Sequence, residues 1–277
     1  MKNKKKLYAL FGNPVEHSLS PVMHTTAFNV MKIDARCIAI RVESAGEIIR
    51  NIEAMDISGA CVTIPHKTAI MDHLDGISES ARLIGAVNTL TVTGGRLEGD
   101  NTDWKGLVLA LKEKIAIEGN TFVVLGAGGA ARAAVFGILR EGGKTVVMNR
   151  TAAKGETLAK EFGCEFRPVS EAGTIEADCL INCTPVGMFP NVEISPVEPE
   201  TLSHFSCVMD MIYNPLETKM LRDARTAGCS VVSGLPMFIC QGGEQIRIWT
   251  GRRPPLGDMM KIVLEKLTDD GRDKASR

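Results

Sequence analysis

Short apolar runs alternate along the chain with segments in which apolar residues recur at helical spacing. The run "ARCIAIRV" is typical of a strand, whereas "AGEIIRNIEAM" carries apolar residues three and four apart. In the first part of the chain the predicted strands are 6–12, 35–42 and 59–65, and the predicted helices are 20–31, 45–55 and 68–75. This alternation is typical of an α/β domain with a mostly parallel sheet.

Two short β runs around Gly94 and Gly95 then predict a hairpin over 88–101. A second alternation follows, with strand-like runs within 121–126, 144–150, 177–185, 206–215 and 229–234, and helices at 104–114, 130–142, 152–163, 218–228, 237–251 and 254–268. We therefore predict the α/β class, with two open α/β domains and a cleft between them. The boundaries predicted are 1–103 plus 237–277 for a substrate-binding catalytic domain and 104–236 for a Rossmann-type nucleotide domain.

Composition narrows the possible partners. The 277 residues are 44% hydrophobic and carry a net charge of -1, which argues against a nucleic-acid or membrane partner. No apolar run approaches the length of a membrane span. The eight cysteines form no CxxC pair and the five histidines are dispersed, so we expect reduced thiols, a cytoplasmic location and no metal. The sequence leaves open whether the protein is a monomer or a homodimer.

The segment "TFVVLGAGGAARAAV" places Gly126, Gly128 and Ala131 in a G-x-G-x-x-A pattern between a Val-rich run and an Ala-rich helix. In dinucleotide sites the first glycine permits a tight turn, the second lets the pyrophosphate approach, and the small third residue lets helix and strand pack closely. The phosphates then face the helix N-terminus. The alternative is a purely structural turn between strand and helix.

The end of the next predicted strand distinguishes NADP from NAD. NAD sites usually place a carboxylate here to bind the ribose 2′-hydroxyl, but this strand ends "VVMNRT". Arg150 instead offers a fork of donors that suits a 2′-phosphate, and Thr151 can cap the next helix, which has Lys154 in its first turn. We therefore predict NADP, with ordinary exposed cations as the alternative.

Two ionisable residues are candidates for proton transfer. Lys67 in "VTIPHK" lies just past a predicted strand, where open α/β sheets bind ligands, and Asp103 in "EGDNTDWKG" begins a predicted helix. A lysine and an aspartate brought together can exchange a proton with a substrate hydroxyl. Alone, each residue is equally compatible with a surface charge or a helix cap.

Motifs along almost the whole chain resemble those of the shikimate dehydrogenase family. They are, in family order, "GNPVEHSLSP", "VTIPHK", "GAVNTL", "GDNTDWKG", "GAGGAAR", "NRT", "NCTPVGM", "DMIYNPLETKML" and "GLPMFICQGGEQIRIWTG". The resemblance implies NADP-dependent, reversible oxidation of shikimate to 3-dehydroshikimate, with Lys67 and Asp103 as the catalytic pair. The alternatives are a quinate/shikimate dehydrogenase of broader specificity and a non-catalytic sensor of shikimate-like ligands.

The resemblance also implies binding residues. The substrate would contact Ser18, Ser20, Thr63, Asn88, Tyr213 and Gln241, and the cofactor would contact Gly126, Gly128, Gly129, Ala130, Ala131, Asn149, Arg150, Thr151, Lys154, Thr184, Gly234 and Met237. Ser18 and Ser20 would bind the substrate carboxylate, with Ser20 as the N-cap of the helix that follows; capping alone is the alternative. Asn88 and Tyr213 could instead be buried structural groups, and Met237 a core residue.

Position 61 departs from the family pattern. Many members carry Asn or Ser there, whereas this chain has Cys61, whose thiol is a poor hydrogen-bond partner. If that side chain touches the substrate, this protein loses a contact, which affects the choice between shikimate and quinate.

Overall fold

The computed structural model describes residues 5–275. The chain forms two compact units, of which the first comprises Met1–Thr102 and Gln241–Arg277 and the second comprises Asp103–Cys240. The boundaries predicted from the sequence lie after residues 103 and 236.

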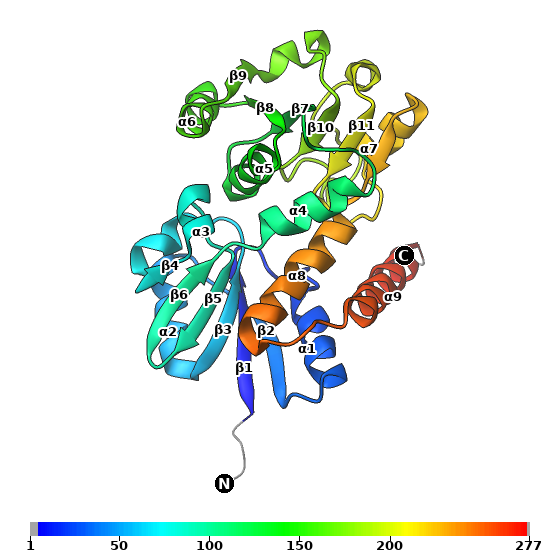
Figure 1. Ribbon diagram of the computed structural model, residues 1–277. Helices are drawn as coiled ribbons and strands as arrows, with labels where there is room; N and C mark the ends of the chain where they lie inside the picture. The colour runs from blue at the N-terminus through cyan, green and yellow to red at the C-terminus, as the bar shows by residue number, and fades with distance from the viewer. Residues whose placement is uncertain (1–4, 276–277) are drawn as a thin grey trace. The chain divides into compact units, whose positions relative to one another are not determined.

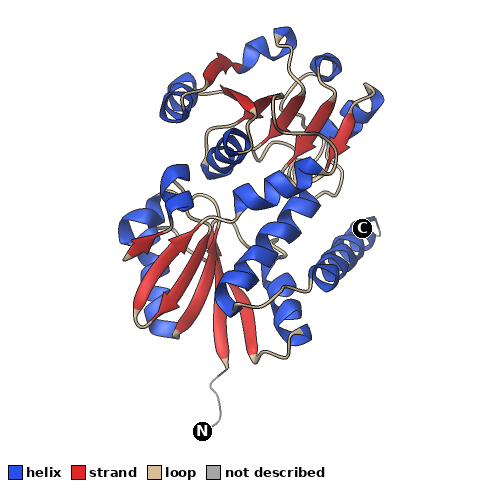
Figure 2. Cartoon of the chain, in the orientation of Figure 1, coloured by secondary structure: helices blue, strands red, loops and turns tan. Residues whose placement is uncertain are grey.

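A six-stranded sheet with the order β2-β1-β3-β5-β6-β4 lies at the centre of the first unit (Figures 1 and 2). Its strands are β1 (Lys6–Gly12), β2 (Ala35–Arg41), β3 (Ile57–Val62), β4 (Gly76–Ile77), β5 (Thr89–Thr93) and β6 (Arg96–Asp100). Its helices are α1 (Ser20–Val30), α2 (Ala45–Met55), the 3₁₀ helix Ala69–His73, α3 (Glu79–Ile84), most of α8 (Gly234–Thr250) and α9 (Leu256–Ala275). The predicted hairpin is confirmed, since β5 and β6 are antiparallel and Leu90 pairs with Gly99.

Both faces of β1 are buried because helices cover both sides of the sheet. Ala9 and Phe11 belong to one apolar cluster, which includes Ile48 of α2. Tyr8 points to the other side, where its ring lies 4.7 Å from the rings of Phe28 and Trp249, which belong to α1 and α8. The parallel pairing of β1 with both β2 and β3 explains the nearly continuous apolar run of this strand.

The second unit contains a six-stranded parallel sheet with the order β12-β11-β10-β7-β8-β9. The strands are β7 (Thr121–Leu125), β8 (Lys144–Asn149), β9 (Glu165–Pro168), β10 (Cys179–Asn182), β11 (Cys207–Asp210) and β12 (Ser230–Val232). Its helices are α4 (Asp103–Lys112), α5 (Gly129–Arg140), α6 (Ala152–Phe162), the 3₁₀ helices Val169–Thr174 and Pro199–His204, and α7 (Lys219–Thr226). The order in which the strands are added to the sheet reverses between β7 and β10, as in the Rossmann fold, and such sheets bind ligands at that switch point.

Alternate residues of β7 face two separate cores. Phe122 and Val124 pack in a cluster with residues of α4 and α5, whereas Val123 and Leu125 pack in a cluster with residues of α7. The predicted two-domain α/β class is therefore confirmed.

One predicted helix is much shorter than expected. The segment 68–75 forms only the 3₁₀ helix Ala69–His73, because Leu74 is extended (φ −101°, ψ 143°) and the Asp75 amide donates to Leu97 O at 2.9 Å. The chain must leave the helix there in order to reach the edge of the sheet. In residues 5–275, no helix combines the length and apolarity that a bilayer crossing requires.

Candidate functional site

The segment Ser18–Ser20 lies where the chain enters α1. The predicted N-cap at Ser20 is wrong: the Met23 amide donates to Leu19 O at 3.0 Å, which makes Leu19 the N-cap, and no side chain caps the helix. The two hydroxyls face each other instead, with their oxygens 3.4 Å apart. Ser18 Oγ also lies 3.4 Å from the amide nitrogen of Ser20, which donates to it. Both hydroxyls therefore lie at a helix N-terminus, where an anion is stabilised.

A buried histidine lies one turn beyond Ser20. Nδ1 of His24 is 2.7 Å from Ser20 O, and Nε2 makes no hydrogen bond of standard geometry, although Gln245 and the Gly242 backbone lie near the ring. Burial lowers the pKa of His24 to about 4, so the ring is neutral at pH 7. Neutral His24 therefore fixes the first turn of α1 without adding charge beside the two serines.

Thr63 and Lys67 follow β3. The Thr63 amide donates to Phe11 O at 2.8 Å, and a Cβ added at Gly12 would lie 2.3 Å from Thr63 Cγ2, so Gly12 is needed for this close approach. Lys67 is half-buried, and its carbonyl accepts a 2.7 Å hydrogen bond from the Val87 amide. The backbone bond therefore holds Lys67 next to the segment that carries Asn88.

Asn88 is 2% exposed and organises a polar cluster within the first unit. Its Oδ1 accepts from the Thr102 amide at 2.8 Å and from Thr89 Oγ1 at 2.7 Å. Its Nδ2 donates to Thr102 Oγ1 at 2.9 Å and to Gln241 Oε1 at 3.4 Å. The structure therefore brings together two of the predicted substrate residues, Asn88 and Gln241, and the internal bonds of Asn88 give it a structural role as well.

Two further residues, which the sequence motifs did not indicate, belong to this cluster. Thr102 directly precedes Asp103, and Gln245 follows Gln241 by four residues on α8. Gln245 donates to Asn88 O at 3.1 Å and accepts from Cys61 Sγ at 3.3 Å. The four-residue helical spacing could have identified Gln245. The thiol that departs from the family pattern therefore makes an internal hydrogen bond.

In the second unit, the glycine-rich segment connects β7 to α5 as predicted. Gly126 has a φ of +117°, which favours glycine, and Ala131 is fully buried. Gly128 is the N-cap of α5, and an added Cβ there would have no neighbour within 4 Å. The segment thus leaves open space at the start of the helix, where Gly129 and Ala130 form the first turn.

The residues after β8 present their polar groups at the start of α6. Asn149 Nδ2 donates to Thr151 O at 2.8 Å. Thr151 is the N-cap of α6, but its side chain accepts no capping bond. Arg150 and Lys154 are exposed, and among residues 5–275 neither has an ion-pair partner. This arrangement fits an anionic group such as a 2′-phosphate.

Of the remaining cofactor candidates of this unit, Thr184 follows β10, and Gly234 follows β12 and begins α8. A Cβ added at Gly126 would be 3.3 Å from Thr184 Cγ2, so these two predicted cofactor residues are neighbours. A Cβ added at Gly234 would lie 2.4 Å from Met211 O, so the close approach that requires this glycine is to the protein's own backbone. The structure therefore supplies a different reason for Gly234 than the expected approach of the cofactor.

Tyr213 and Met237 each contact apolar neighbours. The Tyr213 ring stacks on Phe238 with centroids 4.0 Å apart and planes at 17°. Met237 is 5% exposed and packs in the core of the second unit, as expected of a core methionine. Their contacts with substrate and cofactor stay predictions.

The predicted catalytic residues belong to different units. Lys67 lies in the first unit, and Asp103 is the first residue of the second unit and of α4, where it is 5% exposed. Within the described residues, no three His, Cys, Asp or Glu side chains gather as metal ligands would.

Three sequence families match successive parts of the chain. Residues 10–90 match the shikimate dehydrogenase substrate binding domain, 108–188 match shikimate / quinate 5-dehydrogenase, and 234–264 match the shikimate 5'-dehydrogenase C-terminal domain. The first match lies in the first unit, the second lies in the second unit, and the third crosses the boundary between Cys240 and Gln241.

Full-length relatives agree with the family matches. The shikimate dehydrogenase (NADP(+)) of Geobacillus kaustophilus (strain HTA426) is 44% identical over 274 residues, which are 95% of this chain and 99% of that protein. The shikimate dehydrogenase (NADP(+)) of Methanocaldococcus jannaschii is 40% identical over 96% of this chain and 98% of its own. The crystal structure of shikimate 5-dehydrogenase from Thermus thermophilus in complex with NADP(H) and shikimate has a TM-score of 0.84, with 37% identity over 92% of this chain and 97% of that chain. The chain therefore belongs to the shikimate dehydrogenase family.

Proposed function

We propose that the protein oxidises shikimate reversibly to 3-dehydroshikimate with NADP, and that in the biosynthetic direction it reduces 3-dehydroshikimate. Support comes from the full-length similarity to shikimate dehydrogenases that use NADP(+). The structural observation that carries the proposal is the Rossmann sheet, in which β8 ends at Asn149 and is followed by Arg150 rather than by a carboxylate. No comparison supports the alternative of a non-catalytic sensor.

The residues of the second unit fit a bound NADP. The open space at Gly128 and the first turn of α5 would accept the pyrophosphate. The guanidinium of Arg150, with Thr151 and Lys154 beside it, would bind the 2′-phosphate. When bound, NADP accepts or supplies the hydride at the substrate carbon.

The first unit would bind the substrate. Ser18 and Ser20 would donate hydrogen bonds to the carboxylate at the start of α1, where the helix dipole favours an anion. Thr63, Asn88 and Gln241 would hold the ring hydroxyls, and Tyr213 of the second unit would add a further contact.

Lys67 and Asp103 would move the proton. During reduction the ketone oxygen gains negative charge, which an ammonium group stabilises, and one of the two residues then protonates that oxygen. During oxidation the same pair removes the proton from the hydroxyl. Both residues are needed in this scheme because one carries the proton while the other sets its charge environment.

Absorbance of NADPH tests the proposal. Purified protein mixed with shikimate and NADP should produce the NADPH band. The absorbance should rise much more slowly when quinate replaces shikimate, when NAD replaces NADP, or when both are replaced. Comparable rates with quinate would favour the broader quinate/shikimate dehydrogenase. No absorbance change with any of the four combinations would reject the enzymatic proposal.

We also propose a cytoplasmic location. None of the eight cysteines, all of which lie in the described part of the chain, is in a disulfide.

The oligomeric state is a separate question, and sedimentation of the purified protein distinguishes a monomer from a homodimer.

A further inference from the structure

Two buried polar residues end the neighbouring strands β10 and β11. Asn182 and Asp210 are paired in the parallel register, and both are fully buried. Asn182 Nδ2 donates to Asp210 Oδ1 at 3.1 Å. The pair lies at the carboxyl ends of the strands, which is the edge where such sheets bind ligands.

Asp210 fixes the segment that follows β11. Its Oδ1 also accepts from the Ile212 amide at 3.0 Å, and its Oδ2 accepts from Thr218 Oγ1 at 2.7 Å. Thr218 is the N-cap of α7, whose Leu221 amide donates to the same hydroxyl at 3.4 Å. One carboxylate therefore sets both the turn before Tyr213 and the start of α7.

Asn182 fixes the segment that follows β10. Its Oδ1 accepts from the Thr184 amide at 2.9 Å and from Thr184 Oγ1 at 2.7 Å, while its Nδ2 also donates to Val186 O at 3.1 Å. The Val186 amide in turn donates to Thr184 Oγ1 at 3.2 Å. The conformation of Thr184 is therefore determined by Asn182.

A buried carboxylate is costly, which indicates that this one is kept for its hydrogen bonds. Burial raises the pKa of Asp210 to about 6, although bonds from Ile212, Thr218 and Asn182 oppose the shift. The neighbouring Cys183 thiol has a raised pKa, first because of burial and then because of the negative charges of Asp210 and Asp103. At pH 7 the side chain of Asp210 is therefore mainly a carboxylate, and the thiol of Cys183 beside it is neutral.

We propose that Asn182 and Asp210 are positioning residues, which hold Thr184 and Tyr213 in the geometry that the reaction needs. The proposal rests on the proposed function, because Thr184 is expected to contact the cofactor NADP and Tyr213 is expected to contact the substrate. Neither Asn182 nor Asp210 needs to touch a ligand in order to act, since each works through the loop that it binds.

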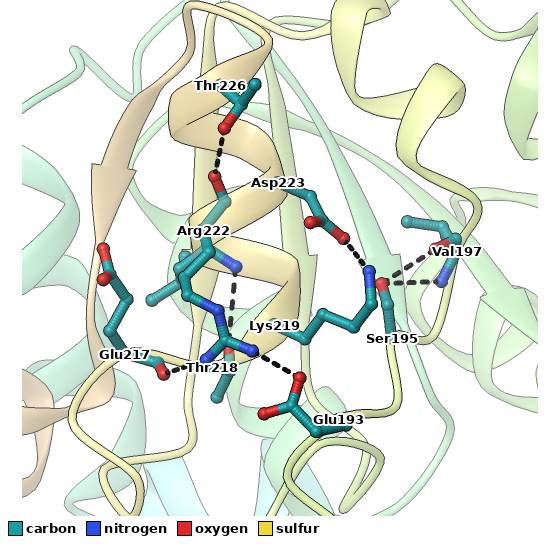
Figure 3. Close-up of polar contacts among 10 residues, drawn as sticks. Glu193, Ser195, Val197, Glu217, Thr218, Lys219, Arg222, Asp223 and Thr226 are labelled. Atoms are coloured by element: carbon teal, nitrogen blue, oxygen red, sulfur yellow. Dashed lines mark hydrogen bonds and ion pairs between the residues drawn. The ribbon is translucent and has the colours of Figure 1, made fainter.

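The segment after β10, which carries Thr184, is also attached to α7 by an exposed ion pair, and this ion pair provides a control. Figure 3 shows Arg222 between the Glu217 carbonyl and the Glu193 carboxylate, with an N–O distance of 2.8 Å to Glu193. The side chains of Arg222 and Glu193 are 41% and 73% exposed. Exposed ion pairs contribute little, so this pair should not determine the conformation of Thr184.

The central test compares Asn182→Ala with the control Glu193→Gln. Asn182→Ala should raise the Kd for NADP by about tenfold, the scale of one lost hydrogen bond to a charged group. It should also speed amide hydrogen exchange in 183–187 and 211–217 by about tenfold or more, because the opening free energy of both loops falls. Glu193→Gln should change each quantity by less than about twofold.

Two further pairs separate positioning from loss of packing. Thr218→Val removes the hydroxyl and keeps the shape, whereas Thr218→Ser keeps the hydroxyl, so only the valine variant should speed exchange in 211–217. Asp210→Asn retains an acceptor for Asn182 and Ile212, and its amide can donate to a rotated Thr218 hydroxyl. It should therefore bind NADP within about threefold of the parent, while Asp210→Ala should bind at least about tenfold more weakly.

The outcomes are distinguishable. If Asn182→Ala lowers the melting temperature but leaves both loop exchange and the NADP Kd at parent values, the network is only structural and the proposal is overturned. If the parent fails to oxidise shikimate, the proposed function is rejected. Faster exchange of both loops in Asn182→Ala would then still support the placement of these loops by Asn182 and Asp210.

Discussion

Burial alters the acid–base behaviour of Asp210 and His24, and in each case it favours the neutral form. The pKa of Asp210 rises to about 6 and that of His24 falls to about 4. Because both shifts arise first from burial, they affect the stability of the fold as well as the site.

For Asp210 the sign can be worked out. The folded pKa of about 6 is above the unfolded value of about 3.9, so the folded state binds more protons between these values. This contribution to stability is fully present below about pH 4 and is lost as the pH rises through about 6. Relative to Asp210→Asn, the parent should be more stable at pH 4.5 than at pH 7 by about 2 kcal/mol in the free energy of unfolding.

Urea unfolding of both proteins at the two pH values measures this difference. Subtracting the free energy of unfolding of Asp210→Asn from that of the parent at each pH removes the contributions of the other titratable groups. An identical difference between parent and variant at pH 4.5 and pH 7 would mean that Asp210 has an ordinary pKa in the folded protein.

Arg150 determines the choice of cofactor in the proposed function. Since NAD lacks the 2′-phosphate, Arg150→Ala should raise the KM for NADP by roughly ten- to a hundredfold and change that for NAD little. The value of kcat at saturating NADP should stay near that of the parent. Rates with both cofactors at saturating shikimate test this prediction.

A matched control is available on the next strand. Arg167 of β9 is also a partly exposed arginine and pairs with Glu165 at 2.6 Å. Arg167→Ala should change neither KM. An equal loss for NAD and NADP in Arg150→Ala would mean that the arginine supports the loop rather than the 2′-phosphate.

Among the elements, α1 allows the clearest test of whether a serine at a helix start binds the substrate or only caps the helix. Because Leu19 is the N-cap and the hydroxyl of Ser18 accepts only a long hydrogen bond of 3.4 Å from the Ser20 amide, Ser18→Ala should lower the melting temperature only slightly. It should raise the KM for shikimate by roughly ten- to a hundredfold, the scale of a hydrogen bond to a charged group.

Ser44 is the matched control because its hydroxyl does cap a helix, accepting from the Glu47 amide at 3.3 Å. Ser44→Ala should lower stability by about 1 kcal/mol and leave the KM unchanged. Should Ser18→Ala instead lose stability while its KM stays at the parent value, the serine would not bind the carboxylate.

The sequence predicted elements better than it predicted their ends. The alternating apolar runs located the strands, and Gly94 and Gly95 located the hairpin, because these signals depend on residues close in the chain. The cap of α1 was misplaced, since serine is a favoured N-cap and leucine is not, yet the helix begins one residue earlier, with Leu19 as its N-cap. The early end of the 3₁₀ helix depends on the Asp75 bond to Leu97, which is not a local signal.

The same distinction applies to the site. The glycine-rich segment could be predicted because Gly126 and Ala131 serve a local turn and a local packing contact. The partners of Asn88 could not, since Thr102 and Gln241 reach it from distant segments. The need for Gly234 was predicted, but the structure attributes it to the protein's own backbone.

In the whole molecule, the chain passes between the two units at Thr102–Asp103 and at Cys240–Gln241. Asn88 binds a residue at each of these points, because its amide contacts both Thr102 and Gln241 within the first unit. A single buried side chain therefore ties together the two places where the chain leaves that unit, one of them directly before Asp103.

Since Lys67 and Asp103 belong to different units, the proposed catalytic pair has to be tested as a pair. Lys67→Ala should lower kcat by roughly 10²–10⁴-fold, the usual effect of a general acid–base group, and change the KM for shikimate far less. Asp103→Asn should lower kcat severely as well. Lys112→Ala removes an exposed lysine that pairs with Glu141, and it should leave kcat at the parent value.

The double variant decides whether the two residues act together. If one proton transfer requires both, removing the second residue should cost much less than it does in the parent, so the combined loss should be smaller than the product of the single losses. Single-turnover rates with saturating NADPH and 3-dehydroshikimate, measured for the parent, the two single variants and the double variant, give these losses. Melting temperatures verify that each variant is folded. Losses that multiply fully would assign Lys67 and Asp103 to independent roles, and a near-normal kcat in Lys67→Ala would remove the lysine from proton transfer.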